Sequence, residues 1–426
     1  LIKTKYPSIR VIWGGGYPTL FPEESIRYPD VDAICIGEGE IALVEYLQSL
    51  KNEQDPLVLG IWAKDSQGRI KRNPPRPFNE RLDELPFPNW EHWQIGEHLR
   101  HNLYFIPGAI KFLASRGCPY SCSFCSNEAI RQAIPGNYYR QRTPQSVIQE
   151  IKANILKYGN RGFKIAHFAD EIFGLHYDFL EKFCRLFKQE GLDRQLAWCC
   201  ATRPDIITPL WAKTAASAGC IWVWLGIESG DDYIRNHVYQ KNIAQEQITQ
   251  AAVHLQNQGI AFNFSMMAGC PQDTRASIFK GIQLINMLDP AAFDYSFYQP
   301  LPKTRLGLAV AQAMPREDFT ACWQPGTPRI RTQTLSLADL KQIMWMIRLV
   351  KLWRFLRNGF KAKKFIFFLD IMEYIFSAGG CRAIPLSSPS LGMDIQLKTL
   401  FKYAAEKKTT DNFTKRARKT DESVIH

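Results

Sequence analysis

The sequence of 426 residues lacks any apolar run long enough to cross a membrane. Its longest strongly apolar stretch, residues 365–376, is interrupted by Asp370 and Glu373, whereas a membrane-spanning helix takes about 20 apolar residues. The chain also does not open with a positively charged leader followed by an apolar core. We therefore exclude a membrane-spanning protein and predict that the eleven cysteines are reduced thiols of a cytoplasmic protein.

Histidines and zinc-type cysteine pairs are scarce as well. No histidine precedes His92, and no CxxC or HxxxH pair stands at the spacing that would complete a zinc site with the cysteine motif at residues 118–125. In that motif, Cys118, Cys122 and Cys125 follow an apolar segment in CxxxCxxC spacing. Three thiolates on one short loop suit a 4Fe–4S cluster with one open iron, because tetrahedral zinc needs a fourth ligand. A zinc loop or three ordinary cysteines is the alternative interpretation.

The composition indicates a globular protein with a basic surface. A hydrophobic content of 46% with 12% aromatics excludes a mostly disordered chain. The net charge of +12 either steers an acidic electron donor of the flavodoxin or ferredoxin type or simply keeps the protein soluble. Residues 352–376 interleave basic and aromatic residues, which is typical of a helix lying on a membrane surface or of a core-facing helix with a basic outer side.

The N-terminal region predicts half of an open α/β sheet. We expect strands over residues 10–13 and 33–36 and a helix over residues 38–50. Glycine-rich turns follow both strands, and ligands of such sheets bind where the strands end. The residues of these turns that we expect near a ligand are Gly14, Gly15, Thr19, Gly37, Glu38 and Gly39.

Farther along, strands alternate with helices in a pattern that predicts a partial parallel (β/α)6 barrel. The expected strands are residues 111–115, 163–168, 196–202, 222–227, 261–267 and 295–298. The domains we predict are a partial flavodoxin-like domain (1–72), a proline-rich linker (73–107), the barrel (108–306), a helical C-terminal region (307–397) and a basic, disordered tail (398–426).

Polar residues follow several of these strands, at the edge where a barrel has its active site. Asp170 can accept a hydrogen bond from an amino group or cap the next helix. Arg203 can bind a carboxylate or pair with Asp205. Glu228 follows an apolar strand and needs polar partners, for which ribose hydroxyls would serve, and the turn at Gly269 can flank an adenine ring.

Together these motifs resemble the radical S-adenosylmethionine (SAM) family, in its branch with an N-terminal cobalamin-binding domain, which includes methyltransferases and a tetrapyrrole cyclase. Further markers are Phe124 before the last cysteine, Gly37-Glu38-Gly39-Glu40 and residues 139–142. The resemblance implies a 4Fe–4S cluster on the cysteines, SAM contacts from Phe124, Asp170, Arg203, Glu228 and Gly269, and cleavage of SAM to a 5′-deoxyadenosyl radical.

The sequence departs from the family pattern in three places. Asp273 stands where the family usually has Glu, and Lys303 where it has Gly. We also expect only two strands before the linker, whereas a flavodoxin-like domain needs about five. We therefore expect the chain to be a fragment or to have lost half of this domain, and to bind cobalamin weakly or not at all.

Our functional prediction is a radical SAM enzyme that transfers a methyl group to, or rearranges, a largely apolar small molecule, with nucleic acid an unfavoured partner. One alternative is a methylthio-transferring enzyme that modifies RNA, although Cys35 is the only cysteine before residue 118 and a second cluster needs more. The alternative of another class is a non-catalytic iron–sulfur or zinc protein. That alternative explains poorly the charged residues at the strand ends.

Overall fold

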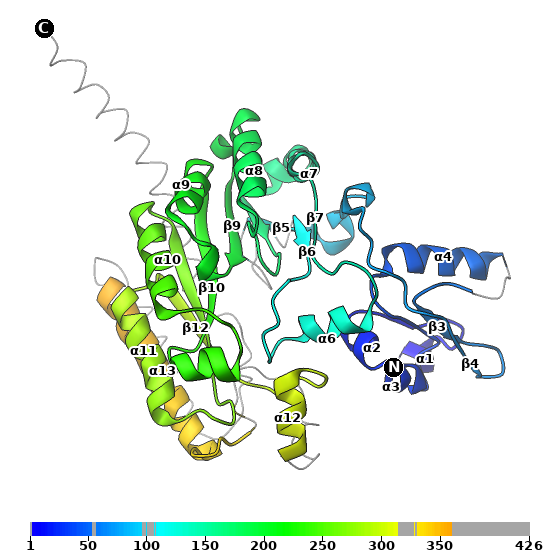
Figure 1. Ribbon diagram of the computed structural model, residues 1–426. Coiled ribbons are helices and arrows are strands. Elements are labelled where there is room, and N and C mark those ends of the chain that lie inside the picture. The colour runs from blue at the N-terminus through cyan, green and yellow to red at the C-terminus, as the bar shows by residue number, and fades with distance from the viewer. Residues whose placement is uncertain are drawn as a thin grey trace, which may run out of the picture.

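The computed structural model describes residues 2–52, 57–95, 99, 106, 108–313, 328 and 330–359. A parallel sheet of six strands forms its main body (Figure 1), and its strands are neighbours in chain order, with β5 and β12 at the two edges. The strands are β5 (Ala109–Phe112), β8 (Ile165–Phe168), β9 (Ala197–Thr202), β10 (Cys220–Glu228), β11 (Ala261–Ala268) and β12 (Ala292–Phe297). The predicted partial barrel is confirmed, and β12 begins three residues earlier than we expected.

Helices connect consecutive strands and cover one face of the sheet: α7 (Pro144–Tyr158), α8 (Tyr177–Gln189), α9 (Pro209–Ser217), α10 (Gln245–Asn257) and α11 (Arg275–Leu288). Two of them begin at a threonine followed by proline. The Thr143 hydroxyl accepts a hydrogen bond from Ser146 N at 3.2 Å, and Thr208 caps α9 in the same way. Such caps satisfy backbone donors that the first helical turn leaves unpaired.

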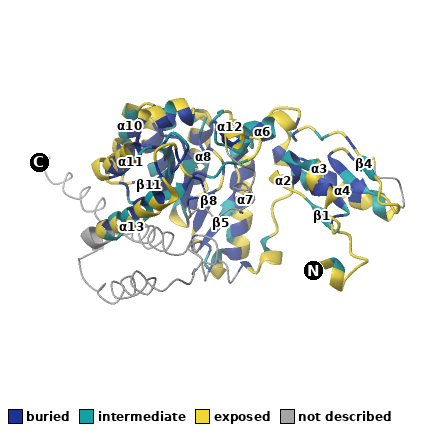
Figure 2. Ribbon diagram, turned by 90° about the horizontal axis from the view of Figure 1, so that it is seen from below, coloured by how far each residue is buried: buried dark blue, intermediate teal, exposed yellow. Residues whose placement is uncertain are grey.

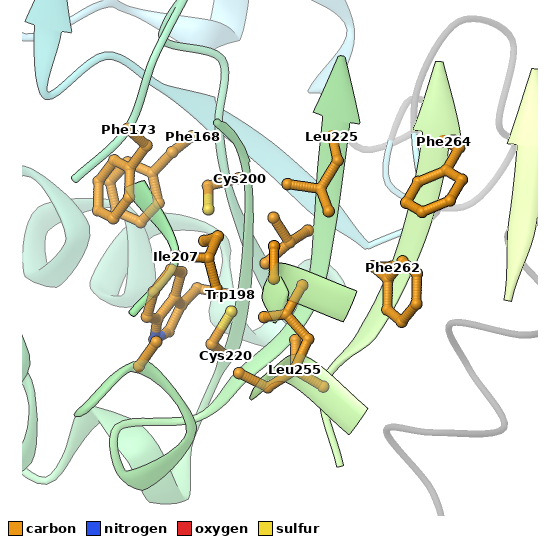
Figure 3. Packing of buried hydrophobic residues seen from close by; sticks show 14 of the residues in the cluster. Phe168, Phe173, Trp198, Cys200, Ile207, Cys220, Leu225, Leu255, Phe262 and Phe264 are labelled. Atoms are coloured by element: carbon orange, nitrogen blue, oxygen red, sulfur yellow. The ribbon is translucent and has the colours of Figure 1, made fainter. Parts of the chain in front are cut away.

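The two faces of the sheet differ because side chains alternate along each strand. One face packs against the helices in the main core, where Phe168, Trp198, Leu225 and Phe264 lie (Figure 3). The opposite face carries a smaller apolar cluster that includes Ile165, Cys199, Trp222 and Ala261. Buried residues accordingly concentrate along the strands (Figure 2).

The N-terminal sheet has four strands, so our expectation of two was wrong. β1 (Ile12–Trp13) and β2 (Ala33–Cys35) are parallel, and β3 (Ile61–Lys64) and β4 (Ile70–Arg72) continue the sheet as an antiparallel hairpin. The hairpin turn contains Gly68 at φ 77°, and the Asp65 carboxylate accepts hydrogen bonds from Gln67 N and Arg69 N. Glycine at positive φ and an aspartate that bonds the backbone are typical of turns. The strands on either side of this turn are too short for a clear alternating pattern.

Short helices accompany the N-terminal sheet: α1 (Ile2–Lys5), α2 (Gly16–Leu20), α3 (Pro22–Arg27) and α4 (Gly39–Lys51). Between it and the large sheet lie α6 (Ser126–Ala133) and the small ribbon of β6 (Ser115–Arg116) and β7 (Arg140–Gln141) (Figure 1). Where the linker is described, it includes 3-10 turns over Leu82–Glu84 and Trp90–Trp93.

In the described part of the chain after the barrel, the helices are α12 (Arg305–Ala313) and α13 (Leu337–Gly359). Leu340, Ile343 and Ile347 of α13 are buried in the main core. The rest of the predicted helical region up to residue 397, the membrane-surface hypothesis for residues 360–376 and the tail prediction lie outside the described residues. Within the described part of the chain, no helix is both long and apolar enough to span a membrane.

Candidate active site

The cysteine loop leaves β6 and passes over the carboxyl edge of the large sheet. It begins at Gly117, whose φ of 80° favours glycine and where an added Cβ would lie 2.2 Å from the Tyr138 carbonyl oxygen. Farther along, Ser123 N donates to Tyr239 O at 3.0 Å, and Leu306 N donates to Ser123 O at 2.9 Å. The loop is therefore held at its start and in its middle by segments distant in sequence.

The three cysteines of this loop are free thiols and half-buried. Burial raises the pKa of Cys118 and raises the pKa of Cys125 to about 11, so these thiols release protons when a metal binds. Among the described residues, no three His, Cys, Asp or Glu side chains are placed to hold one metal ion. A four-iron cluster spreads its ligands more widely than a single ion does, and three accessible thiols on a braced loop fit such a cluster.

Asp170 follows β8 and is buried. Its carboxylate accepts hydrogen bonds from Ala114 N at 3.1 Å and from the amide and hydroxyl groups of Ser115. Burial raises the pKa of Asp170 to about 7, although the bonds from Ser115 and Ala114 oppose that shift. These contacts tie the end of β8 to the strand that leads into the cysteine motif.

Arg203 follows β9 and is also buried. Its guanidinium pairs with both oxygens of Asp205 at 3.0 and 3.1 Å, as our alternative interpretation proposed. The same group lies 3.6 Å from the centre of the Tyr120 ring, and its Nη1 lies 4.0 Å from Cys122 Sγ. A positive charge is thus fixed beside one of the three thiols.

Glu228 ends β10 with a φ of 68°, at a shift in the register with β11. Its Oε1 accepts a hydrogen bond from Lys241 Nζ at 3.0 Å, and both side chains are largely buried. The polar partner that we expected is therefore present within the chain. Sequence analysis missed Lys241, because thirteen residues separate it from Glu228 and no motif joins them.

The turn after β11 is closed by Asp273, one of the departures from the family pattern. One carboxylate oxygen accepts hydrogen bonds from Gly269 N at 2.8 Å and Cys270 N at 3.2 Å. The other accepts from the Ser277 hydroxyl at 2.7 Å. Aspartate therefore closes this turn with a short side chain.

Phe124 lies near the same turn. Its ring meets Tyr239 edge to face at 5.2 Å, beside a small apolar cluster that includes Cys270 and Tyr298. Arg203, Glu228 and Phe124 are joined by contacts to the single segment Tyr239–Lys241: Arg203 Nη2 donates to Lys241 O at 2.8 Å. That segment links three of the predicted SAM contacts.

The N-terminal glycine turns are also joined to each other. The Thr19 hydroxyl donates to Gly15 O at 2.8 Å and accepts from Gly37 N at 2.9 Å. Cβ atoms added at Gly14 and Gly39 would contact Cys35, whereas one added at Gly15 would meet no described atom within 4 Å. The open backbone at Gly15 suits close approach of a ligand, and Thr19 acts within the turn.

Glu38, which we expected near a ligand, pairs with two arginines in the structure. Its Oε1 accepts from Arg116 Nη1 at 2.9 Å and its Oε2 from Arg140 Nη1 at 2.8 Å. Burial works to raise the pKa of Glu38, but hydrogen bonds from Arg140 and Arg116 outweigh it and hold that pKa below its usual range.

The face of the large sheet opposite the main core carries polar residues that sequence analysis did not single out. The rings of His167 and Trp224 stack at 5.2 Å, and Asn263 Nδ2 donates to Asp294 at 2.7 Å. Within the described part of the chain, His167 Nδ1 and Asn263 Oδ1 are buried without a hydrogen-bond partner. The alternation along β8 and β11 was the available signal, since both residues take the face opposite the main core.

Part of the chain matches the model of a known protein family. Residues 112–284 match the model of the Radical SAM superfamily. The chain therefore contains a radical SAM domain, and the resemblance found in its motifs is confirmed. A domain of this class implies a 4Fe–4S cluster and SAM as cofactors.

Several curated proteins are similar to this chain in sequence. An uncharacterized methyltransferase of Pyrococcus horikoshii is 30% identical over 301 residues, covering 70% of this chain and 62% of the relative. An anaerobic magnesium-protoporphyrin IX monomethyl ester cyclase of Rubrivivax gelatinosus is 28% identical over 318 residues, covering 71% of this chain and 53% of the relative. The chain spans about half to three fifths of the length of the curated relatives it matches.

The fold is similar to that of the cobalamin-dependent S-adenosylmethionine radical enzyme OxsB, solved with aqua-cobalamin and SAM bound. The TM-score is 0.62 at 18% identity, and the match covers 98% of this chain and 68% of the other. The match therefore extends beyond the barrel to the N-terminal sheet.

Proposed function

We propose that this protein is an enzyme that reductively cleaves SAM at a 4Fe–4S cluster on Cys118, Cys122 and Cys125, and then methylates or rearranges a small molecule. The observation that carries this proposal is the braced loop of half-buried thiols at the carboxyl edge of the parallel sheet, with Arg203 beside Cys122. The methyltransferase and cyclase relatives support both outcomes.

Cys118, Cys122 and Cys125 would hold the cluster, which when bound would supply the one-electron reduction that cleaves SAM. The protein binds and orients the reactants and excludes water. Arg203 places its positive charge beside Cys122, with Nη1 4.0 Å from the Cys122 sulfur. Asp170 holds residues 114–116, the stem of the cysteine loop, through bonds from Ala114 and Ser115. The apolar cluster that includes Trp222 keeps water from the sheet face opposite the main core.

We further propose that SAM lies between Phe124, Arg203, Glu228 and the Gly269 turn, which all adjoin the cysteine loop or the segment Tyr239–Lys241. The substrate would lie against the sheet face opposite the main core, near His167, Trp224 and Asn263. Buried polar atoms without partners cost free energy, so a substrate able to hydrogen-bond His167 Nδ1 and Asn263 Oδ1 would be favoured over a purely apolar one.

Cobalamin is the third cofactor we propose, at the glycine turns of the N-terminal sheet. Our expectation of weak or no binding rested on a sheet of two strands, whereas this sheet has four. The open backbone at Gly15 and Gly16 supports this placement, since no described atom lies within 4 Å of a Cβ built at either position. The similarity in fold to OxsB, which is solved with aqua-cobalamin, supports it independently.

The test is anaerobic reconstitution with iron and sulfide, followed by reduction with dithionite in the presence of methyl-labelled SAM. We expect iron–sulfur absorbance and formation of 5′-deoxyadenosine, both lost when the three loop cysteines are replaced by alanine. Cys35→Ala is the control, because that thiol lies in the N-terminal sheet, and it should retain both. Unchanged absorbance and SAM cleavage in the triple variant would refute the proposal.

A further inference from the structure

The carboxylate of Glu38 lies between two arginines of the ribbon that carries the cysteine motif. Arg140 is almost fully buried, with a side-chain exposure of 4%, against 19% for Glu38 and 26% for Arg116. The neighbouring Glu40 contributes a second, more exposed bond to Arg116, at 2.7 Å. Charged groups buried to this degree are retained in a fold only with close partners.

This carboxylate joins segments that are otherwise separate. Glu38 stands between Gly37 and Gly39, in the turn that Thr19 bonds and from which α4 begins. It also accepts a hydrogen bond from Asn79 N at 3.0 Å, and Arg140 Nη1 donates to Asn79 O at 3.0 Å. The N-terminal turn, the linker and the β6–β7 ribbon therefore meet at one side chain.

The ribbon in turn determines where the cysteines lie. Arg116 pairs with Arg140 in the β6–β7 register, and it is followed directly by Gly117 and Cys118. On the barrel side, Asp170 holds Ser115, the preceding residue. The stem of the loop is thus held from the barrel by Asp170 and from the N-terminal sheet by Glu38.

We propose that Glu38 is a positioning residue for the iron–sulfur cluster, coupling the glycine turn of the N-terminal sheet to the cysteine loop, rather than a contact for a ligand of that sheet. The proposal rests on the proposed function, in that it takes the cluster to be held by the three cysteines. Partners that orient the ligands of a metal site typically contribute about 10–100-fold to metal affinity.

The test compares Glu38→Gln with two matched variants on the same turn and helix. Glu40→Gln removes only the exposed bond to Arg116. Glu45→Gln removes an ion pair with Arg76 that lies away from the cysteine loop. Each reconstituted protein is assayed for the rate of iron release to a chelator and for the EPR spectrum of the reduced cluster, with and without SAM.

We expect Glu38→Gln to release iron about tenfold faster and to change the EPR spectrum of the SAM complex. Glu40→Gln should have a smaller effect and Glu45→Gln none. Equal release rates and superimposable spectra for Glu38→Gln and the wild type would overturn the inference.

Two further outcomes are distinguishable. If the wild type takes up no cluster, the proposed function fails and this inference fails with it. If Glu38→Gln does not fold, as judged by circular dichroism, Arg116→Lys is measured in the same way. That variant keeps the charge but loses the planar group that pairs with two carboxylates at once, so unchanged iron release in it would also overturn the proposal.

Discussion

At the residue scale, the charged side chains that follow the strands form hydrogen bonds mostly with other groups of the chain. Asp170 directs its carboxylate into the backbone of Ala114 and Ser115, and Arg203 directs most of its donors to Asp205 and Lys241. Such side chains position the cysteine loop through its stem and through Tyr120. Their replacement should therefore alter the cluster as well as SAM binding.

His167 offers a prediction about pH. Burial, aided by the charge of Lys111, lowers the pKa of His167 from 6.5 to about 4. A group whose pKa falls on folding contributes stability above its unfolded pKa and loses it as the pH falls toward the folded value. The free energy of unfolding should therefore fall by about 1.4 kcal/mol per pH unit below pH 6.5 on account of this residue.

In urea unfolding at pH 7.5 and pH 5, the wild type should accordingly lose about 2 kcal/mol more than His167→Gln. Because the two proteins share all other titrating groups, the difference between their pH dependences reports on His167 alone. Parallel pH dependence of the two proteins would show that His167 is not held neutral by the fold.

Glu228→Gln tests the pair with Lys241. We expect weaker SAM binding by about 1–3 kcal/mol, the scale for losing a buried polar partner, as measured by calorimetric titration of the reconstituted protein. The double variant Glu228→Gln/Lys241→Met removes the unpaired buried charge and should recover stability without recovering SAM affinity. Unchanged affinity and activity in Glu228→Gln would assign the residue a structural role alone.

At the scale of the element, substitutions of glycine test whether the position of the cysteine loop depends on close packing at its stem. Gly117→Ala introduces a Cβ 2.2 Å from Tyr138 O at a φ of 80°, which forces the cysteine loop to shift. Gly162→Ala has a φ of 101° but no described atom within 4 Å of the new Cβ, so it isolates the conformational cost of about 1–2 kcal/mol. Thermal unfolding and iron content should show a larger loss for Gly117→Ala, and equal losses would contradict a tightly packed stem.

Elements with strong local signals were predictable from the sequence, and those made by short or distant pairings were not. The helix α7 has such a local signal, because Thr143-Pro144 marks its start and its apolar residues recur at helical spacing. β3 and β4 were missed because strands of four and three residues carry too little alternation. The cysteine loop was predictable from spacing alone, whereas its bonds to Asp170 and Glu38 span 55 and 78 residues of chain.

At the scale of the whole molecule, the C-terminal segment reaches the predicted SAM side of the barrel. Gln333 N donates to Pro271 O at 2.7 Å, and the Thr334 hydroxyl donates to Asp273 O at 3.1 Å. Leu340 of α13 lies near Gly269, 3.6 Å from where a Cβ would stand. The region that we predicted as a separate helical extension thus contributes to the barrel core and supports the Gly269 turn.

Substitutions along α13 test this shared core. Ile343 is 1% exposed among the main-core residues, so Ile343→Ala should lower the free energy of unfolding by about 2–5 kcal/mol through lost burial and the cavity left behind. Leu349, on the same helix, is 55% exposed, and Leu349→Ala should stay within about 0.5 kcal/mol of the wild type. Both are measured by urea unfolding followed by tryptophan fluorescence, because Trp198, Trp211 and Trp222 are buried in the barrel and report on its unfolding. If Ile343→Ala left that transition unchanged, α13 would be an appendage to the barrel. A shifted transition would make α13 one of the elements on which the geometry of the Gly269 turn depends.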